Sequence, residues 1–192
     1  MEDRIKMAKA IADPLYPLTG EPLKRFSEIL VLKEYDKGEI ILNEGQICRH
    51  ICYVNKGLVR QFYYKHEKDL TEHFSTEGCI FICIESFFKQ EPTYLMAEAL
   101  EPAELYCIPH DPLEALAAEV PEVEVLYRKI MEQSLVGSQR KADFFRFETA
   151  RERYDKFIKA FPEASKRAAL IHIASFLLMT PETLSRVRAG VL

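Results

Sequence analysis

Residues 173–188 read IASFLLMTPETLSRVR, and this stretch decides how the C-terminal part of the chain folds. An apolar segment is followed by three residues, 178–180, and then by a second segment with a strong helix start. Thr180 is a good N-cap residue, Pro181 suits the first helical position, and Glu182 places an acid in the first turn. Two short helices joined by three residues have the dimensions of a helix-turn-helix unit. The stretch therefore predicts this motif.

The two predicted helices, residues 165–177 and the helix that begins at Pro181, have chemically distinct faces. Ala174 is small where the helices cross, and apolar contacts are expected from Ile171, Ile173, Leu177, Leu184 and Val187. On the outward face, arginine can donate two hydrogen bonds to guanine, glutamate can accept from cytosine, and hydroxyls reach bases or phosphates. The expected DNA contacts are therefore Thr180, Glu182, Thr183, Ser185, Arg186 and Arg188, with Lys166, Arg167, Arg151 and Arg153 on phosphates. The alternative is an ordinary solvated helix face.

The charge of the chain is unevenly distributed. The 192 residues carry 26 Lys and Arg and 30 Asp and Glu, a net charge of −4. Residues 1–127 hold 13 basic and 23 acidic residues, a net charge of −10, whereas residues 128–192 hold 13 and 7, a net charge of +6. A basic segment joined to an acidic body is expected when one part meets a polyanion. The apolar fraction of 48% excludes disorder as the main state.

One long helix is predicted before this basic segment, from Pro121 to about Phe147, a length of roughly 40 Å. Apolar and small side chains recur along it at a spacing of three to four residues. They are Val123, Tyr127, Ile130, Met131, Leu135, Ser138, Ala142 and Phe145. The stripe packs either on the chain's own body or on a second copy in a parallel helix pair. We favour the homodimer, because the stripe is longer than one small body can cover.

Residues 31–108 alternate short β-branched and aromatic segments with turn signals such as Asn-Lys-Gly. The predicted strands are Leu32–Tyr35, Glu39–Leu42, Ile51–Val54, Leu58–Tyr64, Leu70–Phe74, Thr93–Leu100 and Leu105–Ile108. Strands of this number and spacing predict a sandwich, a jelly roll or a small barrel. A helix capped by Asp111 follows them, and a further helix ends at Pro162.

No apolar run has the length of a signal peptide or a membrane span, so we expect a cytoplasmic protein with no membrane partner. The five cysteines form an odd set without a Cys-x-x-Cys pair, which is typical of reduced thiols in a cytosol. Cys48 with Cys52, and Cys79 with Cys83, are spaced i, i+4, which on a strand separates them by about 13 Å. We therefore expect no metal and no other cofactor.

The chain resembles the Crp/Fnr-type bacterial transcription regulators over residues 18–188. The resemblance rests on residues 173–188, on Asp36-Lys37-Gly38-Glu39-Ile40-Ile41 followed by Glu44-Gly45, and on Tyr53-Val54-Asn55-Lys56-Gly57-Leu58-Val59-Arg60. It implies an α+β protein: a cyclic-nucleotide-binding-like jelly roll as sensor domain (1–120), a dimerisation helix (121–147) and a helix-turn-helix domain (148–192). It also implies that Glu182 and Arg186 face bases, with double-stranded DNA, a second copy and RNA polymerase as partners.

Two departures from the family pattern are visible in the C-terminal domain. The glycine common in the turn is Leu178 here, which must avoid a left-handed backbone or accept strain. The sequence after Arg188 holds no residues for a β-wing, so we expect most or all of the wing to be missing. Its absence would remove some phosphate contacts and would affect affinity for DNA more than specificity.

The family's nucleotide-binding cassette is also altered. It begins with Gly-Glu for the ribose, but Gly78 is followed by Cys79, and the positions of its Arg-Ser pair hold Thr93 and Tyr94. No arginine lies between Arg60 and Arg128, and burying a phosphate without one is costly. We predict that cyclic AMP does not bind. An unknown small-molecule effector would contact Phe81, Glu85, Ser86, Thr93, Tyr94 and Met96, unless these residues are simply jelly-roll core.

Catalysis finds no support, since the sequence has no nucleophile elbow, phosphate loop or dinucleotide fingerprint. We predict that the protein is not an enzyme. The rival function is that of a ligand- or protein-binding sensor module, whose helical tail makes protein contacts and does not bind DNA. A tail folded against the body would favour this rival or an inactive state of the regulator.

Overall fold

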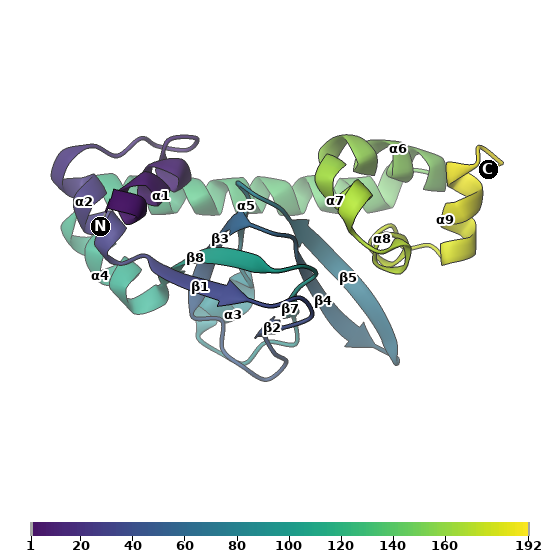
Figure 1. Cartoon of the computed structure of the whole chain (residues 1–192), viewed down its shortest axis with the longest axis horizontal. Helices are drawn as coiled ribbons and strands as arrows, with labels where there is room; N and C mark the ends of the chain where they lie inside the picture. Colours follow the sequence, from purple (N-terminus) through teal and green to yellow (C-terminus); the bar gives the residue numbers. More distant parts are fainter. Residues whose placement is uncertain (1, 192) are drawn as a thin grey trace.

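The computed structural model describes residues 2–191. Figure 1 shows a β-body in the middle, a group of helices at each end, and one long helix, α5 (Pro121–Phe147), that spans the distance between them. The N-terminal end of the molecule holds α1 (Glu2–Ala12), α2 (Gly20–Glu28) and α4 (His110–Glu119). The C-terminal end holds α6 (Ala150–Ala160), α7 (Pro162–Arg167), α8 (Leu170–Phe176) and α9 (Pro181–Arg188).

The β-body consists of two antiparallel four-stranded sheets. Their strand orders are β1-β8-β3-β6 and β2-β7-β4-β5. Small and branched residues from both sheets, including Val54, Val59, Ala97 and Leu105, are fully buried together. The strands are β1 (Val31–Tyr35), β2 (Ile40–Leu42), β3 (His50–Lys56), β4 (Val59–Lys65), β5 (Lys68–Ser75), β6 (Ile80–Phe81), β7 (Met96–Ala99) and β8 (Ala103–Pro109). The predicted α+β class and all seven predicted strands are confirmed, and the two-residue β6 is additional.

Gly57 explains one of the turn signals. It has a φ of +103°, and a Cβ there would lie 2.7 Å from the carbonyl oxygen of Pro102. Both the left-handed backbone and the close approach of the two chain segments require glycine. The turn brings the start of β4 beside the start of β8, which positions the surface that receives the C-terminal helices.

Three helices were not predicted: α1, α2 and α3 (Ile84–Lys89). Helices α1 and α2 pack on each other, and α2 also contacts α5. The helix predicted after the strands exists as α4, but Asp111 is not its N-cap. The N-cap is Pro109, because strand β8 continues directly into the helix, and Asp111 lies in the first turn.

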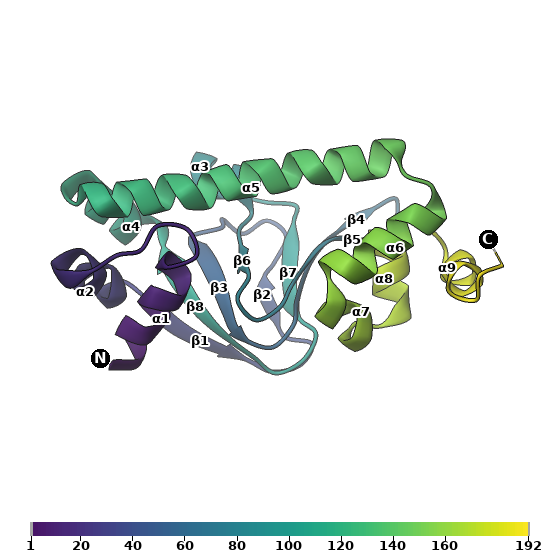
Figure 2. The ribbon, with the colours of Figure 1, turned by 90° about the horizontal axis from the view of Figure 1, so that it is seen from above.

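Helix α5 has the predicted bounds and passes along one side of the β-body (Figure 2). Val123 and Ile130, in its first half, are buried against the body and the N-terminal helices. In its second half Leu135 is 71% exposed and Val136 is 47% exposed. The body therefore covers the first part of the apolar stripe, and Phe145 at its end contacts Phe176 of α8. Leu135 and Ser138 between them are exposed, and pairing with a second copy through them remains a prediction.

The C-terminal helices differ from the prediction at one place. The single helix expected over residues 165–177 is divided into α7 and α8, because Ala168 and Ala169 adopt extended backbone with ψ of 147° and 145°. The break turns α8 so that Ile171 is 61% exposed, and the packing contact expected from this side chain is wrong. None of the described helices is both long and apolar enough to cross a membrane.

Candidate functional site

The helix pair α8 and α9 forms around the residues that predicted it. The Thr180 hydroxyl caps α9 by accepting a hydrogen bond from the Thr183 amide at 3.2 Å, and Pro181 occupies the first turn. Leu184 and Val187 are fully buried against the preceding helices. Leu178 adopts a φ of +53°, so the turn accepts the left-handed conformation that glycine usually provides.

Helix α9, which carries the predicted recognition face, lies at the end of the molecule farthest from α1 and α2 (Figures 1 and 2). Backbone and Thr180 hydrogen bonds at the helix start lower the pKa of Glu182, which favours its charged form. Neither Arg186 nor Arg188 has an ion-pair partner among residues 2–191. The exposed residues of this face are Thr180, Glu182, Ser185, Arg186 and Arg188, and Thr183 is half-buried.

The residues predicted to contact phosphates have different surroundings. Lys166 is exposed and pairs with Glu163 at 2.9 Å, one turn earlier on α7. Arg151 Nη1 donates to the Val187 carbonyl at 3.0 Å and so holds the C-terminal end of α9 against α6. Arg167, by contrast, points toward the β-body.

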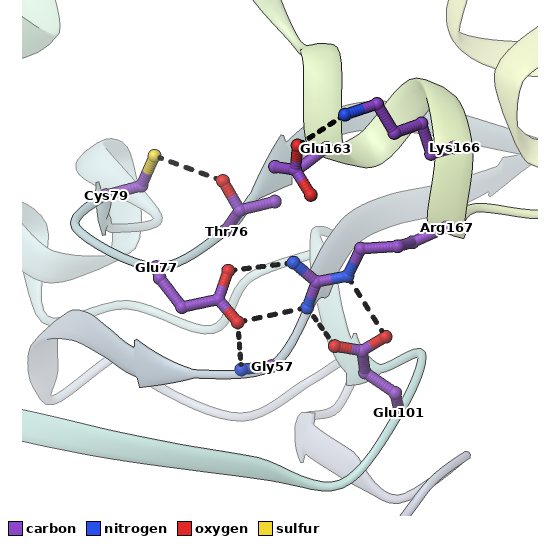
Figure 3. Close-up of polar contacts among 8 residues, drawn as sticks. All are labelled: Gly57, Thr76, Glu77, Cys79, Glu101, Glu163, Lys166 and Arg167. Carbon is purple, nitrogen blue, oxygen red and sulfur yellow. Dashed lines mark hydrogen bonds and ion pairs between the residues drawn. The ribbon is translucent and has the colours of Figure 1, made fainter.

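Arg167 is clamped between two carboxylates of the β-body (Figure 3). Its Nη1 and Nη2 donate to Glu77 at 2.8 and 3.0 Å, its Nε donates to Glu101 at 3.2 Å, and Nη2 also pairs with Glu101. Glu77 in turn accepts from the Gly57 amide at 2.8 Å. The hydrogen bonds from Arg167 lower the pKa of Glu77 to about 2. Arg167 therefore joins α7 to two turns of the body.

A second contact places α8 along β5, the edge strand of its sheet. The Ser175 hydroxyl accepts from the Thr71 amide and donates to the Asp69 carbonyl, both at 2.8 Å. An edge strand leaves such backbone groups unpaired unless another element covers them. The side chain of Ser175 thus completes the β5 edge with atoms from the C-terminal helices.

Arg60, on β4, is the centre of a buried ion network beneath this contact. Its side chain is 3% exposed and binds both carboxylate oxygens of Asp69, at 2.6 and 2.9 Å, and Glu98 at 2.7 Å. Its Nη1 also lies 2.8 Å from Nδ1 of His172 on α8. Burial and the nearby Arg60 charge lower the pKa of His172, which is therefore a neutral acceptor. One arginine links both carboxylates to α8.

Aromatic rings fill the remaining space between the body and the C-terminal helices. Phe176 of α8 lies at their centre, with ring centroids 5.4 Å from Phe157 and Phe161 and 5.7 Å from Phe74 of β5. Phe74 and Phe157 are 1% exposed. The C-terminal helices are therefore docked on the body by an apolar centre as well as by ion pairs.

A large cavity of about 1210 Å³ lies between the β-body, α5 and the docked helices. Five of the six predicted effector contacts line it: Phe81, Glu85, Ser86, Thr93 and Tyr94. Met96 does not; it is buried in β7, opposite Phe62 of β4. Two of the lining hydroxyls serve structural bonds, since Ser86 accepts from the Cys48 amide at 2.9 Å and Thr93 accepts from the Leu95 amide at 2.9 Å.

Further polar side chains that the sequence did not predict also line this cavity, among them Gln61, His73 and Lys141. Lys141 reaches from α5 to β5, where it pairs with the carboxylate and the carbonyl oxygen of Glu72. Desolvation lowers its pKa. The basic residues that line this cavity come from α5 and α6. They lie after residue 128, outside the range in which the lack of arginine predicts that no phosphate binds. The carboxylate on Lys141 leaves it less available to an anionic ligand.

The docked helices make the protein sensitive to acid through His73, on β5. Burial, followed by the Lys141 charge, lowers its pKa to about 4, and its ring contacts Phe161 edge-on at 5.5 Å. An unfolded histidine protonates near pH 6.5, so stability is full above that pH and is lost as the pH falls toward 4. We expect a loss of about 3 kcal/mol from this group alone.

Chemical denaturation across this pH range measures the loss, and His73→Gln should reduce it. The exposed His66 provides the matched control, since His66→Gln should leave the pH profile unchanged. A wild-type profile that is flat between pH 6.5 and 4 would contradict the assignment.

Within residues 2–191, no three His, Cys, Asp or Glu side chains are placed to hold a metal ion. The sulfur atoms of Cys52 and Cys107, on the neighbouring strands β3 and β8, lie 3.2 Å apart.

Comparisons with known proteins agree with this architecture. The family model of the cyclic nucleotide-binding domain matches residues 32–120. No curated protein matches the sequence. The structure of FixK2 from Bradyrhizobium japonicum is similar, with 20% identity, a TM-score of 0.72, and coverage of 85% of this chain and 84% of that chain.

Two further solved structures are similar over most of their length. The Thermus thermophilus catabolite activator protein has 20% identity and a TM-score of 0.57, covering 91% of this chain and 84% of its own. A proposed transcriptional regulator of the Crp/Fnr family from Eubacterium rectale has 17% identity and a TM-score of 0.69, covering 90% and 83%. Residues 32–120 therefore resemble the cyclic nucleotide-binding domain, and the three solved structures share the fold of most of the chain.

Proposed function

We propose that this chain is a DNA-binding transcription regulator of the Crp/Fnr type, in which residues 148–192 bind DNA and α9 enters the major groove. The observation that carries the proposal is the state of α9. Thr180 caps the helix, and the buried side chains of Leu184 and Val187 pack its inner face on the preceding helices. Its outer face presents two exposed arginines that have no ion-pair partner among residues 2–191. Arginine, glutamate and hydroxyl groups on one exposed helix face suit base edges and phosphates.

The second part of the proposal is a homodimer formed along α5. The exposed Leu135 continues the apolar stripe whose first half is already buried, and the exposed Val136 lies beside it. Parallel pairing along this stripe would present two copies of α9 to half-sites about 34 Å apart on a pseudo-palindrome. The dimerisation helix is then residues 121–147, and residues 1–120 form the sensor domain.

The docked arrangement of the C-terminal helices bears on the rival function. The C-terminal helices are held on the β-body by contacts from Arg167, Ser175 and Phe176. Such docking is expected of a protein-binding module or of a regulator in its inactive state. The exposure of α9 in this docked arrangement favours the regulator, since none of the described residues of the body covers the proposed reading face. In the DNA-bound state, a phosphate contact by Arg167 requires release of Glu77 and Glu101.

Cyclic AMP is not the proposed effector. The cassette positions hold Cys79, Thr93 and Tyr94, and the Thr93 hydroxyl is engaged by the backbone of Leu95. Lys141, a half-buried cation of the cavity, is paired with Glu72. Calorimetry that found micromolar affinity for cyclic AMP would contradict this part of the proposal.

The reading role of α9 is tested by comparing Arg186→Ala with Lys166→Ala on a duplex selected from a random pool. Arg186→Ala should cost about 1 to 3 kcal/mol and relax the preference at one base pair. Lys166→Ala should weaken binding to all sequences alike and flatten the salt dependence. Gel shifts across a salt series separate these outcomes. If Arg186→Ala left the sequence preference intact, the groove assignment would be wrong.

A further inference from the structure

Four of the five cysteines line one cavity inside the β-body, separate from the large cavity beside α5. This second cavity has a volume of about 440 Å³ and lies between strands β1, β2, β3 and β8. The four are Cys48, Cys52, Cys83 and Cys107, each with a free thiol. The tertiary fold brings them together from positions up to 59 residues apart, so no sequence motif predicts that they share a cavity. The fifth cysteine, Cys79, does not reach this cavity.

Cys52 and Cys107 face each other directly across the ladder of β3 and β8. Their sulfur atoms are 3.2 Å apart. Directly opposed residues of an antiparallel pair have Cα atoms about 4.5 to 5.5 Å apart, which lies within the range that disulfides span. A bond length of about 2.05 Å therefore requires the sulfurs to approach by roughly 1.2 Å, a shift that side-chain rotation can supply.

The other two thiols of the cavity, Cys48 and Cys83, are hydrogen-bonded to each other, and this bond lowers the pKa of Cys48 to about 7. The Cys48 sulfur also lies 3.4 Å from the carbonyl oxygen of His50, and the Cys83 sulfur lies 3.5 Å from the Gln61 amide nitrogen. Cys52 and Cys107 differ from them because they are directly opposed on one β-ladder, where the backbone already holds the two residues within the span of a disulfide.

The cavity also provides access and a charge. Its lining includes the exposed residues Gln46 and Arg49, so a small solute can enter from solvent although both cysteines are buried. The ammonium of Lys33 is also at the cavity, 3.4 Å from Nε2 of His50. A hydrogen bond from the Cys52 thiol, and then the Lys33 charge, lower the pKa of Cys107. The thiolate is the form of cysteine that attacks peroxides.

We propose that Cys107 and Cys52 form a redox-active thiol pair that a small hydroperoxide oxidises to a reversible disulfide. The Cys107 thiolate attacks the terminal oxygen of the peroxide, the O–O bond breaks, and the leaving alkoxide takes a proton from water. The Cys107 sulfenic acid then condenses with the Cys52 thiol, forming the S–S bond and releasing water. In total, two thiols and one peroxide give one disulfide, one alcohol and one water.

Peptide mapping after treatment with one equivalent of tert-butyl hydroperoxide tests the proposal on the full chain. Free thiols are blocked under native conditions and then in denaturant, before proteolysis without reductant. We expect an intramolecular Cys52–Cys107 link, a decrease from five titratable thiols to three, and full recovery after dithiothreitol. A Cys48–Cys83 link, or five thiols remaining after treatment, would overturn the proposal.

Two variants separate this pair from the other cysteines. Cys79→Ala should form the same link, because Cys79 lies outside the thiol cavity. Cys52→Ala should abolish the link and leave a Cys107 sulfenic acid that dimedone traps. The assignment of Cys107 as the attacking group would be wrong if two results were found together. These are no dimedone adduct on Cys107 in Cys52→Ala, and oxidation of cysteines other than Cys52 and Cys107 in the wild-type chain. The wild-type mapping decides the proposal even if Cys52→Ala fails to fold.

Discussion

Arg60→Ala is expected to destabilise the protein by about 3 to 5 kcal/mol, the range measured when one partner of a buried ion pair is removed. The substitution leaves the carboxylates of Asp69 and Glu98 without their shared cation, and it also removes the donor on His172. The carboxylate side chains are 35% and 16% exposed, so solvent replaces the lost contacts only in part. Urea denaturation of the full chain measures the change.

Arg25→Ala is the matched control for this experiment. Arg25 also pairs with a carboxylate distant in sequence, that of Glu119, but the two side chains are 36% and 62% exposed, far more than that of Arg60. Exposed ion pairs contribute about 1 kcal/mol or less. Equal destabilisation by Arg60→Ala and Arg25→Ala would show that the Arg60 network has no special role. We expect only the Arg60 variant to expose the C-terminal helices to protease.

Phe176→Ala should have an effect of similar size, about 3 to 5 kcal/mol, because it removes a large buried side chain and leaves a cavity. Phe176 is 3% exposed and contacts rings from β5, α5 and α6. The loss falls on the contact between the β-body and the C-terminal helices, so docking should weaken together with overall stability.

Hydrogen exchange at one amide reports this docking directly. The Thr71 amide donates to the Ser175 hydroxyl of α8, so its protection depends on the docked helices. Phe176→Ala should speed exchange at Thr71 more than at Val54, which is buried in the core of the β-body. The control is Phe147→Ala, whose ring is 75% exposed, with an expected change within about 0.5 kcal/mol. Unchanged protection of Thr71 in Phe176→Ala would contradict the docking account.

Local signals predicted the elements that are specified locally. Helix α5 has its predicted bounds because Pro121 starts it and the apolar period continues to Phe147. Helix α9 begins where Thr180 and Pro181 indicate. Helices α1 and α2 were missed because short apolar pieces mixed with charges around Pro14 and Pro17 show no clear period. Their burial depends on α5, which lies about a hundred residues later.

The docking residues show why the candidate site could be predicted only in part. The exposed face of α9 follows from helical spacing alone. Arg60, however, meets its partners Asp69, Glu98 and His172 at separations of 9, 38 and 112 residues. Arg167 likewise meets Glu77 and Glu101 at separations of 90 and 66 residues. These contacts form only when the chain folds, so the spacing of nearby residues in the sequence cannot predict them.

The central claim is that the C-terminal helix pair binds duplex DNA through α9. Selection of bound fragments from a pool of random duplexes, with the purified full chain at low salt, tests it most directly. The account predicts enrichment of an inverted repeat whose half-sites lie about one helical turn apart, since two copies of α9 would read it together. A chain that retained no duplex, or retained all sequences equally, would contradict the claim and favour the protein-binding module.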